Sequence, residues 1–500
     1  MRNSRHHIVV GLALLFAAHA FARDEYSRTV DKTAILGSGQ SVRVEHRMGN
    51  INLRTHPGRD VAVHASIRVS ASNNADAKRL SDQIRIEVAP SGSTLIIRTE
   101  YPKEEHDGFF GFHGPSYLSY SVNLEITMPD TAPLELRNSF GTVSVEDLKA
   151  NAGIVNAHGK LTFRNGRGSQ RLENQFAAVE VTGNTGDVDI RNANGNVDVS
   201  DVTGMVNVKD RFASITITNP GRGGVIDNGN GNVQVTGAGG DVHITNSFGK
   251  VTVSGVKGNL TVGNGNGEVE ANSITGSAEL NTSFATVRFG DIGKTLSVHA
   301  ANSAVIGRKV GESATIENSF GRVDVSEVRK GIRIVGGNSP ITVADVGEEA
   351  SLKTSFGLVT ADRIGGLLTV EDSNGAVKAS AIRNSANVKT SFGAVMLDGV
   401  SGAVDVENQN GGVEVSLQGQ SCRPVGIHTS FSALRVRVPN NASYAVVAKT
   451  SFGKIHSDLP MTISGDIGND SLTGNIGAGG CPMRLNDNNG SIEILKNGKG

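Results

Sequence analysis

Apolar and polar positions alternate along this chain in a pattern that recurs at every eighteenth position. Stepping by this period from Val143 to Val413 meets sixteen positions, and every one of them is Val, Ile or Leu. Within one repeat the apolar positions are separated by two, three, four and two residues, as in Val251, Val253, Val256, Leu260 and Val262. A separation of two places side chains on one face of a β-strand. The pattern therefore predicts two short strands per repeat, each followed by a turn.

The turn after the second strand carries a ladder in which phenylalanine alternates with asparagine, as in NSFGKVTV at 246–253. The phenylalanines recur at every second repeat, at Phe140, Phe176, Phe212, Phe248, Phe284, Phe320, Phe356 and Phe392. Asparagine occupies the corners halfway between them, with His158 in the first such place, at Asn194, Asn230, Asn266, Asn302, Asn338, Asn374 and Asn410. We interpret this ladder as structural: each ring fills the core over a smaller Asn turn, and each Asn caps its turn through its own amide. On this interpretation Phe284→Ala destabilises the fold without changing any ligand preference. The alternative is that the rings lie exposed in a row, in which case the ladder is a candidate contact surface for a partner.

The repeat predicts an all-β fold rather than a helical one, because its strands are rich in β-branched residues and are interrupted by Gly. A left-handed β-helix built from hexapeptides has coils of the same length, but its aliphatic positions would recur at every sixth position. We therefore expect a flattened parallel β-solenoid with about 18 residues and two short strands per coil. Sixteen coils stacked at the usual strand spacing would form a rod of about 75 Å.

The repeat register divides the chain into four parts: 1–22, 23–133, 134–418 and 419–500. Residues 134–418 hold the regular coils. Residues 23–133 form an N-terminal β-rich cap with strands expected at 41–46, 51–55, 60–71, 83–89, 93–100 and 120–128, and one helical turn at 75–80. Past Val415 the register slips, because Phe431 comes three positions later than the spacing of the phenylalanines predicts. We expect irregular C-terminal coils and a cap there, since an array needs its last edge protected.

The segment 1–22 has the features of a secretory signal peptide. A basic start precedes an apolar run at 8–18, and Ala20-Phe21-Ala22 places cleavage before Arg23, with an uncleaved anchor as the alternative. Removing 1–22 takes away two Arg and no acid, so that acidic side chains then outnumber Lys and Arg by three. This balance argues against a nucleic-acid surface. No later stretch is apolar enough to cross a bilayer, so we expect an exported protein without a transmembrane anchor after cleavage.

The two cysteines are Cys422 and Cys481. In an exported chain an isolated pair most simply forms one disulfide, which here would staple the C-terminal cap. A zinc site is the alternative, but it needs further ligands and no His/Cys cluster surrounds either residue.

One aromatic segment, 102–120, differs from the sequence around it. It lies between two predicted strands, and its candidate binding residues are His106, Phe109, Phe110, Phe112, His113, Tyr117 and Tyr120. The first hypothesis is an insertion whose rings fold back onto the cap. The alternative is an exposed aromatic tip that touches a partner or a membrane surface.

No pattern of catalytic, metal-binding or cofactor-binding residues stands out, so we expect none of these sites. Calcium-binding nonapeptide repeats place Asp in their turns, whereas these corners hold Phe, Asn, Ser and Gly. Enzymes that cleave polysaccharides on β-solenoids focus two or more carboxylates on one patch. Here the acids are scattered over repeat positions, and the histidines outside 102–120 and the basic start are mostly isolated.

Three stretches resemble the bacterial putative-adhesin β-strand-repeat family, an envelope domain of unknown function. They are the entry VNLEITMPDTAPLELRNSFGTVSVEDL at 122–148, the recurring NSFGxVxV and NGxVxV corners, and the exit TGNIGAGGCPMRLNDNNGSIEIL at 473–495. The resemblance implies a right-handed solenoid in the cell envelope, linked to adhesion or envelope sensing. We therefore expect a non-enzymatic, adhesin-like scaffold in the periplasm or outside the cell that binds a protein, a glycan or an envelope component. The alternatives are a polysaccharide-active β-helix enzyme, either lyase or hydrolase, and a purely structural periplasmic rod.

Overall fold

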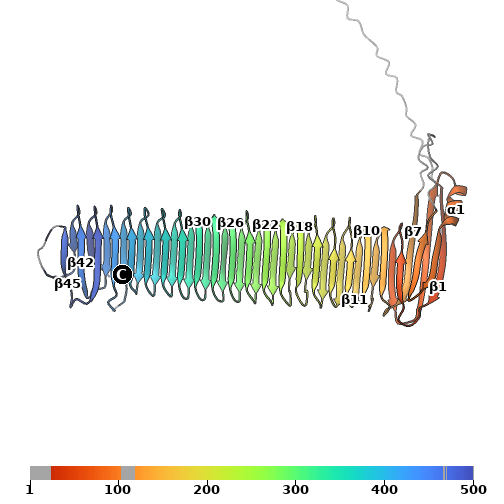
Figure 1. Ribbon diagram of the computed structural model, residues 1–500, viewed down its shortest axis with the longest axis horizontal. Coiled ribbons are helices and arrows are strands. Elements are labelled where there is room, and N and C mark those ends of the chain that lie inside the picture. The colour runs from red at the N-terminus through yellow and green to blue at the C-terminus, as the bar shows by residue number, and fades with distance from the viewer. Residues whose placement is uncertain (1–23, 103–118, 420, 465–467, 469, 499–500) are drawn as a thin grey trace, which may run out of the picture.

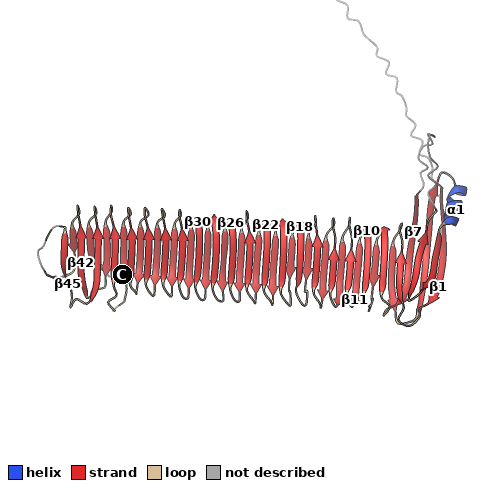
Figure 2. Ribbon diagram, viewed as in Figure 1, coloured by secondary structure: helices blue, strands red, loops and turns tan. Residues whose placement is uncertain are grey.

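Each repeat folds into one coil of two strands joined by two turns. The computed structural model describes residues 24–102, 119–419, 421–464, 468 and 470–498. In this range the coils stack into a straight rod, and nearly all regular structure is strand (Figures 1 and 2). Equivalent strands of successive coils pair in parallel, and each residue pairs with its counterpart one repeat later, as Val233 with Val251 and Val251 with Val269. The predicted all-β parallel solenoid is confirmed.

Two sheets face each other along the rod. One sheet has 23 strands in the described residues. Its members from the regular coils are β9 (Val143–Glu146), β11 (Leu161–Arg167), β13 (Val179–Thr185), β15 (Val197–Val202), β17 (Ile215–Thr218), β19 (Val233–Thr236), β21 (Val251–Val256), β23 (Val269–Ile274), β25 (Val287–Ile292), β27 (Val305–Val310), β29 (Val323–Val328), β31 (Ile341–Val346), β33 (Val359–Ile364), β35 (Val377–Ile382), β37 (Val395–Val400) and β39 (Val413–Leu417). The facing sheet contains β8 (Leu134–Phe140), β10 (Ala152–His158), β12 (Gln170–Glu173), β14 (Val188–Arg191), β16 (Val206–Asp210), β18 (Gly224–Asn230), β20 (Val242–Phe248), β22 (Leu260–Asn266), β24 (Ala278–Thr282), β26 (Leu296–Asn302), β28 (Ala314–Phe320), β30 (Ile332–Asn338), β32 (Ala350–Thr354), β34 (Leu368–Asp372), β36 (Ala386–Thr390) and β38 (Val404–Asn408).

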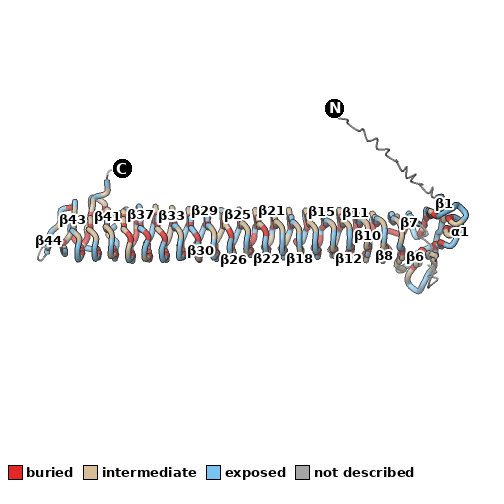
Figure 3. Tube along the Cα trace, turned by 90° about the horizontal axis from the view of Figure 1, so that it is seen from above, coloured by how far each residue is buried: buried red, intermediate tan, exposed pale blue. Residues whose placement is uncertain are grey.

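The core is a narrow aliphatic layer between the two sheets. All sixteen positions of the series from Val143 to Val413 are at most 1% exposed. Most residues between them along the strands face outward, so buried positions alternate with partly or fully exposed ones in most coils (Figure 3). This alternation arises because successive side chains of a strand point to opposite faces.

The N-terminal cap covers the first edge of the stack. Its elements are β1 (Asp24–Ile35), β2 (Ser41–Glu45), β3 (Ile51–His56), β4 (Asp60–Ala71), α1 (Asn74–Gln83), β5 (Arg85–Ser91), β6 (Thr94–Glu100) and β7 (Ser119–Pro129). β2 and β3 already form a coil, because they pair in parallel with β8 and β9. β4 pairs antiparallel with both β1 and β7, and α1 packs on β1 and β4. No helix in the described part of the chain has the length and apolar character that a membrane crossing requires.

The C-terminal coils do not stack in chain order. Their elements are β40 (Val425–Thr429), β41 (Leu434–Val438), β42 (Tyr444–Thr450), β43 (Ile455–Ser457), β44 (Met461–Ile463), β45 (Ser471–Ile476), β46 (Cys481–Asp487) and β47 (Ile492–Lys496). The last coil, β46 and β47, lies between the coil of β40 and β41 and the coil of β42 and β43. β45 pairs antiparallel with β42 and with β44 at the end of the rod. The chain thus runs outward, turns back, and inserts its final coil into the stack.

Candidate functional site: an aromatic comb along one edge

The corner phenylalanines face solvent in a row along one edge of the rod. Ten of them are between 42% and 84% exposed, namely Phe140, Phe176, Phe212, Phe248, Phe284, Phe320, Phe356, Phe392, Phe431 and Phe452. The expectation that these rings fill the core is therefore wrong, and Phe284→Ala would open no cavity in the core. We call these ten residues the comb.

A buried polar side chain two residues before the corner, present at every comb corner, explains why the rings face outward. Asn246 is 2% exposed, and its Nδ2 lies within hydrogen-bond reach of the carbonyls of Gly231 and Gly249. This amide fills the inside of the corner and satisfies carbonyl groups from two successive coils. A ring could not replace it without leaving those carbonyls unpaired, which is costly in a buried site.

The buried polar position recurs through most of the stack and was not recognised in the sequence. Its members are Asn138, Asn156, Asn174, Asn192, Asp210, Asn228, Asn246, Asn264, Thr282, Asn318, Thr354, Asp372, Thr390, Asn408, Thr429, Thr450 and Asp487. The signal was present, because a polar residue recurs in the register of the repeat two places before the ladder position, except at Ala300 and Gly336.

The exposed ladder asparagines do not cap their turns as expected. The side-chain amide of Asn194 donates a hydrogen bond to the carbonyl of Gln175 at 3.2 Å. In the described residues no other ladder asparagine donates a hydrogen bond from its side-chain amide. The capping role belongs instead to the buried position two residues earlier. The exposed Asn side chains are therefore short polar groups between much longer rings.

Corners with Phe and corners without Phe continue to alternate in the C-terminal coils when the coils are taken in their stacking order. They do not alternate in the order of the sequence. Strand pairing places Thr429 beside Asp487, and Asp487 beside Thr450. The corners two residues further on therefore follow the order Phe431, Asn489 and Phe452. The inserted final coil supplies an Asn corner where the alternation requires one.

The first comb rings show how a ring is accommodated between two others. His158 stacks face to face on Phe140 at a centroid distance of 4.6 Å and an interplanar angle of 3°. It stacks on Phe176 at 4.6 Å and 2°. We call the space between neighbouring comb rings a slot. His158 fills the first slot, and each of the others has an asparagine at its floor.

Small residues flank the comb on both sides. The residue after each ladder position is Gly, Ala or Ser, and the residue before it is Ser, Gly or Ala at most corners, as in Ser247 and Gly249 around Phe248. No long side chain adjacent in sequence therefore covers most of the rings. The edge is open to an approaching partner.

The candidate binding segment begins and ends beside the N-terminal end of the comb. Six of its seven named residues, His106 to Tyr117, lie outside the described residues. Tyr120 lies in β7, half-buried, and stacks on Tyr101 at 5.3 Å. The Tyr101 hydroxyl accepts a hydrogen bond from the backbone N–H of Met48, whose corner pairs with that of Phe140. Burial raises the pKa of Tyr101 to about 12.

A polar hollow of about 370 Å³ lies beside the C-terminal half of the comb. Two of its three carboxylates are paired with lysines: Lys353 Nζ is 2.7 Å from Glu371 Oε2, and Lys389 Nζ is 2.9 Å from Glu407 Oε2. The third, Asp372, is buried and has no basic partner among the described residues. The hydrogen bond from Lys353 lowers the pKa of Glu371, which holds that group ionised rather than poised to donate a proton. Among the residues that the structure describes, no group of three or more His, Cys, Asp or Glu could hold a metal ion.

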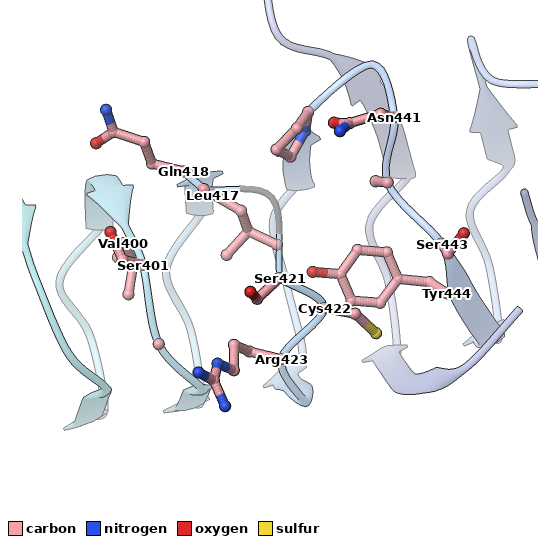
Figure 4. Close-up of a pocket in the computed structure, with 14 residues that line it drawn as sticks. Val400, Ser401, Leu417, Gln418, Ser421, Cys422, Arg423, Asn441, Ser443 and Tyr444 are labelled. Atoms are coloured by element: carbon pink, nitrogen blue, oxygen red, sulfur yellow. The ribbon is translucent and has the colours of Figure 1, made fainter.

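The disulfide between Cys422 and Cys481 is confirmed. It ties the loop before β40 to the start of β46, beside a small hollow of about 140 Å³. Tyr444 extends toward Leu417 and Ser421 in this hollow (Figure 4). Burial raises the pKa of its hydroxyl. The Tyr444 ring is part of the C-terminal core cluster.

Replacing Asp372 with Asn should stabilise the fold by about 1 kcal/mol near neutral pH, the scale of one added hydrogen bond. Asp372 occupies the buried polar position, and its Oδ2 has no hydrogen-bond partner. At the equivalent place Asn408 donates to the Gly393 carbonyl at 2.8 Å. Burial raises the pKa of Asp372, so this side chain contributes most to the stability of the fold when its carboxyl is protonated. That contribution is lost as the pH rises above about 4, the pKa of an Asp in the unfolded chain.

Urea unfolding at pH 4 and pH 7 measures this effect. The variant should gain more stability at pH 7 than at pH 4. Asp405→Asn, at an exposed strand position, is the control and should change stability little. An Asp372→Asn protein that is less stable than the parent at pH 7 contradicts the account.

Two solved structures show a distant similarity to this chain. A solved structure described as a putative cell adhesion protein from Clostridium sporogenes ATCC 15579 is 11% identical, with 37% of this chain and 100% of that chain covered and a TM-score of 0.22. A putative adhesin from Parabacteroides distasonis ATCC 8503 is also 11% identical, with 63% and 97% covered and a TM-score of 0.14. A comparison with curated proteins finds no match.

The family model described as Toastrack DUF4097 matches residues 48–495. This range starts at the corner of the first coil, Met48, and ends in β47, the last strand of the inserted coil. It therefore includes the complete comb. The chain belongs to the Toastrack DUF4097 family.

Proposed function

We propose that this chain is an exported, non-enzymatic binding scaffold of the cell envelope, adhesin-like, and that the comb is its contact surface. The observation that carries the proposal is the row of ten exposed phenylalanines on one edge. Single exposed apolar residues scattered over a protein surface are normal, but a regular row of ten along one edge is not a scatter of this kind and points to an interaction site. Export rests on the signal-peptide pattern of residues 1–22 and agrees with the disulfide.

The ladder itself argues that the rings serve something outside the fold. The same corner closes with Asn at every second coil, so the turn has no need of a ring. Exposing a large ring to water carries a hydrophobic penalty, which binding would remove. A purely structural rod would be stable with Asn, Ser or Thr at all corners. The partner classes that suit such an edge are a protein, a glycan or another envelope component.

A comb-deficient variant tests the proposal. It carries Phe248→Asn, Phe284→Asn, Phe320→Asn and Phe356→Asn, which copy the residue of the neighbouring corners. The purified chain and the variant are incubated with washed envelope fragments and with insoluble glycans, and bound protein is measured by co-sedimentation. We expect at least tenfold weaker binding by the variant, since each ring buries apolar area worth on the order of 1 kcal/mol.

The control variant changes the opposite edge of the rod. Lys309→Asn and Arg363→Asn replace exposed residues near the ends of β27 and β33, just before the other turn, at positions of positive φ that Asn tolerates. This variant should bind like the parent chain. The proposal is wrong if the comb-deficient variant binds as tightly as the parent, or if neither binds any fraction.

A further inference from the structure

We infer that the comb pairs with the comb of a second copy of this chain, so that two antiparallel rods interlock along this edge. The inference rests on the proposed function, because it takes the comb as the contact surface, and it names the partner. In the envelope assay the purified chain would then bind by exchanging onto copies already present in the fragments. Eight of the ten rings of each copy would enter a slot of the other, above the asparagine at its floor.

The filled first slot supplies the geometry for this pairing. Comb rings are two coils apart, about 9.6 Å at the usual strand spacing. A ring placed midway is then about 4.8 Å from each neighbour. His158 sits in this arrangement, 4.6 Å from both Phe140 and Phe176. The remaining slots have the same period and an Asn in place of the imidazole, so each accepts the outer part of one planar ring.

The period favours a second copy over other partners. A partner must present planar rings across the rod axis at every second coil over the length of the comb. A second comb has this spacing by construction. A linear glycan could lie along the edge but would leave the slots empty, because its sugar rings are joined along the chain and do not stand across it as separate plates.

Alternation and symmetry together select the antiparallel orientation. The edge has twenty corners: Met48, the sixteen from Phe140 to Asn410, then Phe431, Asn489 and Phe452. Phenylalanine holds every even place in this order. Antiparallel overlap over the full length brings place n opposite place 21 − n, so each even place meets an odd one. Eight of the ten rings then meet a slot with an asparagine at its floor, while Phe431 meets the slot that His158 fills and Phe452 meets Met48. A parallel two-fold pair would instead set ring against ring.

The area and shape of the edge suit a stable, closed dimer. Aromatic side chains present about 200 Å² each, so ten half-exposed rings offer roughly 1,000 Å² per chain. A standard interface uses about 800 Å² per partner. The rod is straight in both views, so two edges can stay in register over their length (Figures 1 and 3). A two-fold contact of this kind is self-complementary and closes at two copies.

Analytical ultracentrifugation of the purified full chain measures the dimer directly. We expect the parent chain to be dimeric at micromolar concentration and the comb-deficient variant to be monomeric, with a dissociation constant raised more than tenfold. Circular dichroism should be the same for both. A monomeric parent chain would overturn the inference; if the comb-deficient variant still loses envelope binding, the proposed function stands without it.

A slot-filling variant distinguishes interlocking of the rings from nonspecific hydrophobic association. Asn266→Phe, Asn302→Phe and Asn338→Phe place rings in three slots while adding exposed apolar surface. Interlocking predicts that this variant loses the dimer despite its extra rings. Stronger association of the variant than of the parent would contradict the inference.

Cross-linking tests the orientation. Places 10 and 11 face each other at the centre of an antiparallel pair, so Ser283→Cys, beside Phe284, lies about one coil from its own copy. Ser139→Cys, beside Phe140 near one end, would lie on the order of 80 Å from its own copy. We expect an intermolecular disulfide from Ser283→Cys and none from Ser139→Cys. The reverse result, or efficient cross-linking of both, would exclude the antiparallel pair.

Discussion

Replacing Gly249 with Ala should destabilise the coils around it by about 3–5 kcal/mol, because it combines backbone strain with a backbone clash. Gly249 follows Phe248 at the comb corner and has φ of 113°. An added Cβ would lie 2.2 Å from the carbonyl oxygen of Gly231 in the preceding coil. That oxygen belongs to the stack itself, so it cannot move away without separating two coils. The same close approach recurs in the register of the repeat, as at Gly231 and Gly159.

Urea unfolding and hydrogen exchange of residues 215–285 measure this loss. Gly263→Ala, in the outward-facing part of β22, is the matched control, because nothing lies within 4 Å of the Cβ it would add. Alanine in place of that strand glycine should be neutral or stabilising by up to about 1 kcal/mol. Equal stability of the Gly249→Ala protein and its parent would refute the close-stacking account.

Removing the disulfide should cost the C-terminal end of the rod about 4 kcal/mol through loop entropy, since the two cysteines are 59 residues apart. Cys481 begins β46, which lies between β40 and β42. Without the bond, the final coil must find its place between two other coils with no covalent tether. We therefore expect Cys422→Ser with Cys481→Ser to open residues 425–496 first.

Hydrogen exchange and limited proteolysis distinguish this local opening from global unfolding. The coils between 134 and 400 should keep their protection, because in a stacked array each coil contacts mainly its neighbours. Ser421→Ala, next to Cys422, serves as the control and should leave the C-terminal coils protected. If the double variant exchanges at the same rate as the parent throughout 425–496, the disulfide does not hold the final coil.

In the N-terminal cap, apolar alternation predicted most strands correctly but missed one. The six expected strands in 23–133 correspond to β2 through β7, and the predicted helical turn at 75–80 is part of the ten-residue α1. β1 was not predicted, because none of its twelve residues is buried and its sequence, DEYSRTVDKTAI, shows little apolar alternation. It is a strand because β4 provides a complete antiparallel partner.

At the comb corner the spacing rules cannot say which way a side chain faces. In a strand, two-residue alternation assigns each side chain to the core or to solvent, and these assignments held at all sixteen aliphatic positions. At Phe248 the chain turns, and alternation no longer applies. The outward direction of the ring depends on Asn246, which bonds to a glycine of another coil.

The sequence by itself determined the coil length, the two strands per coil, the aliphatic core and the cysteine pair. The first three follow from the period of the apolar residues, and the pair follows from the presence of only two cysteines in the chain. Only the tertiary structure decided that the rings form an exposed comb and that the last coil lies inside the stack. Both depend on contacts between coils that are distant along the chain: the buried amides that close each corner from within, and the pairing of β46 with β40 and β42.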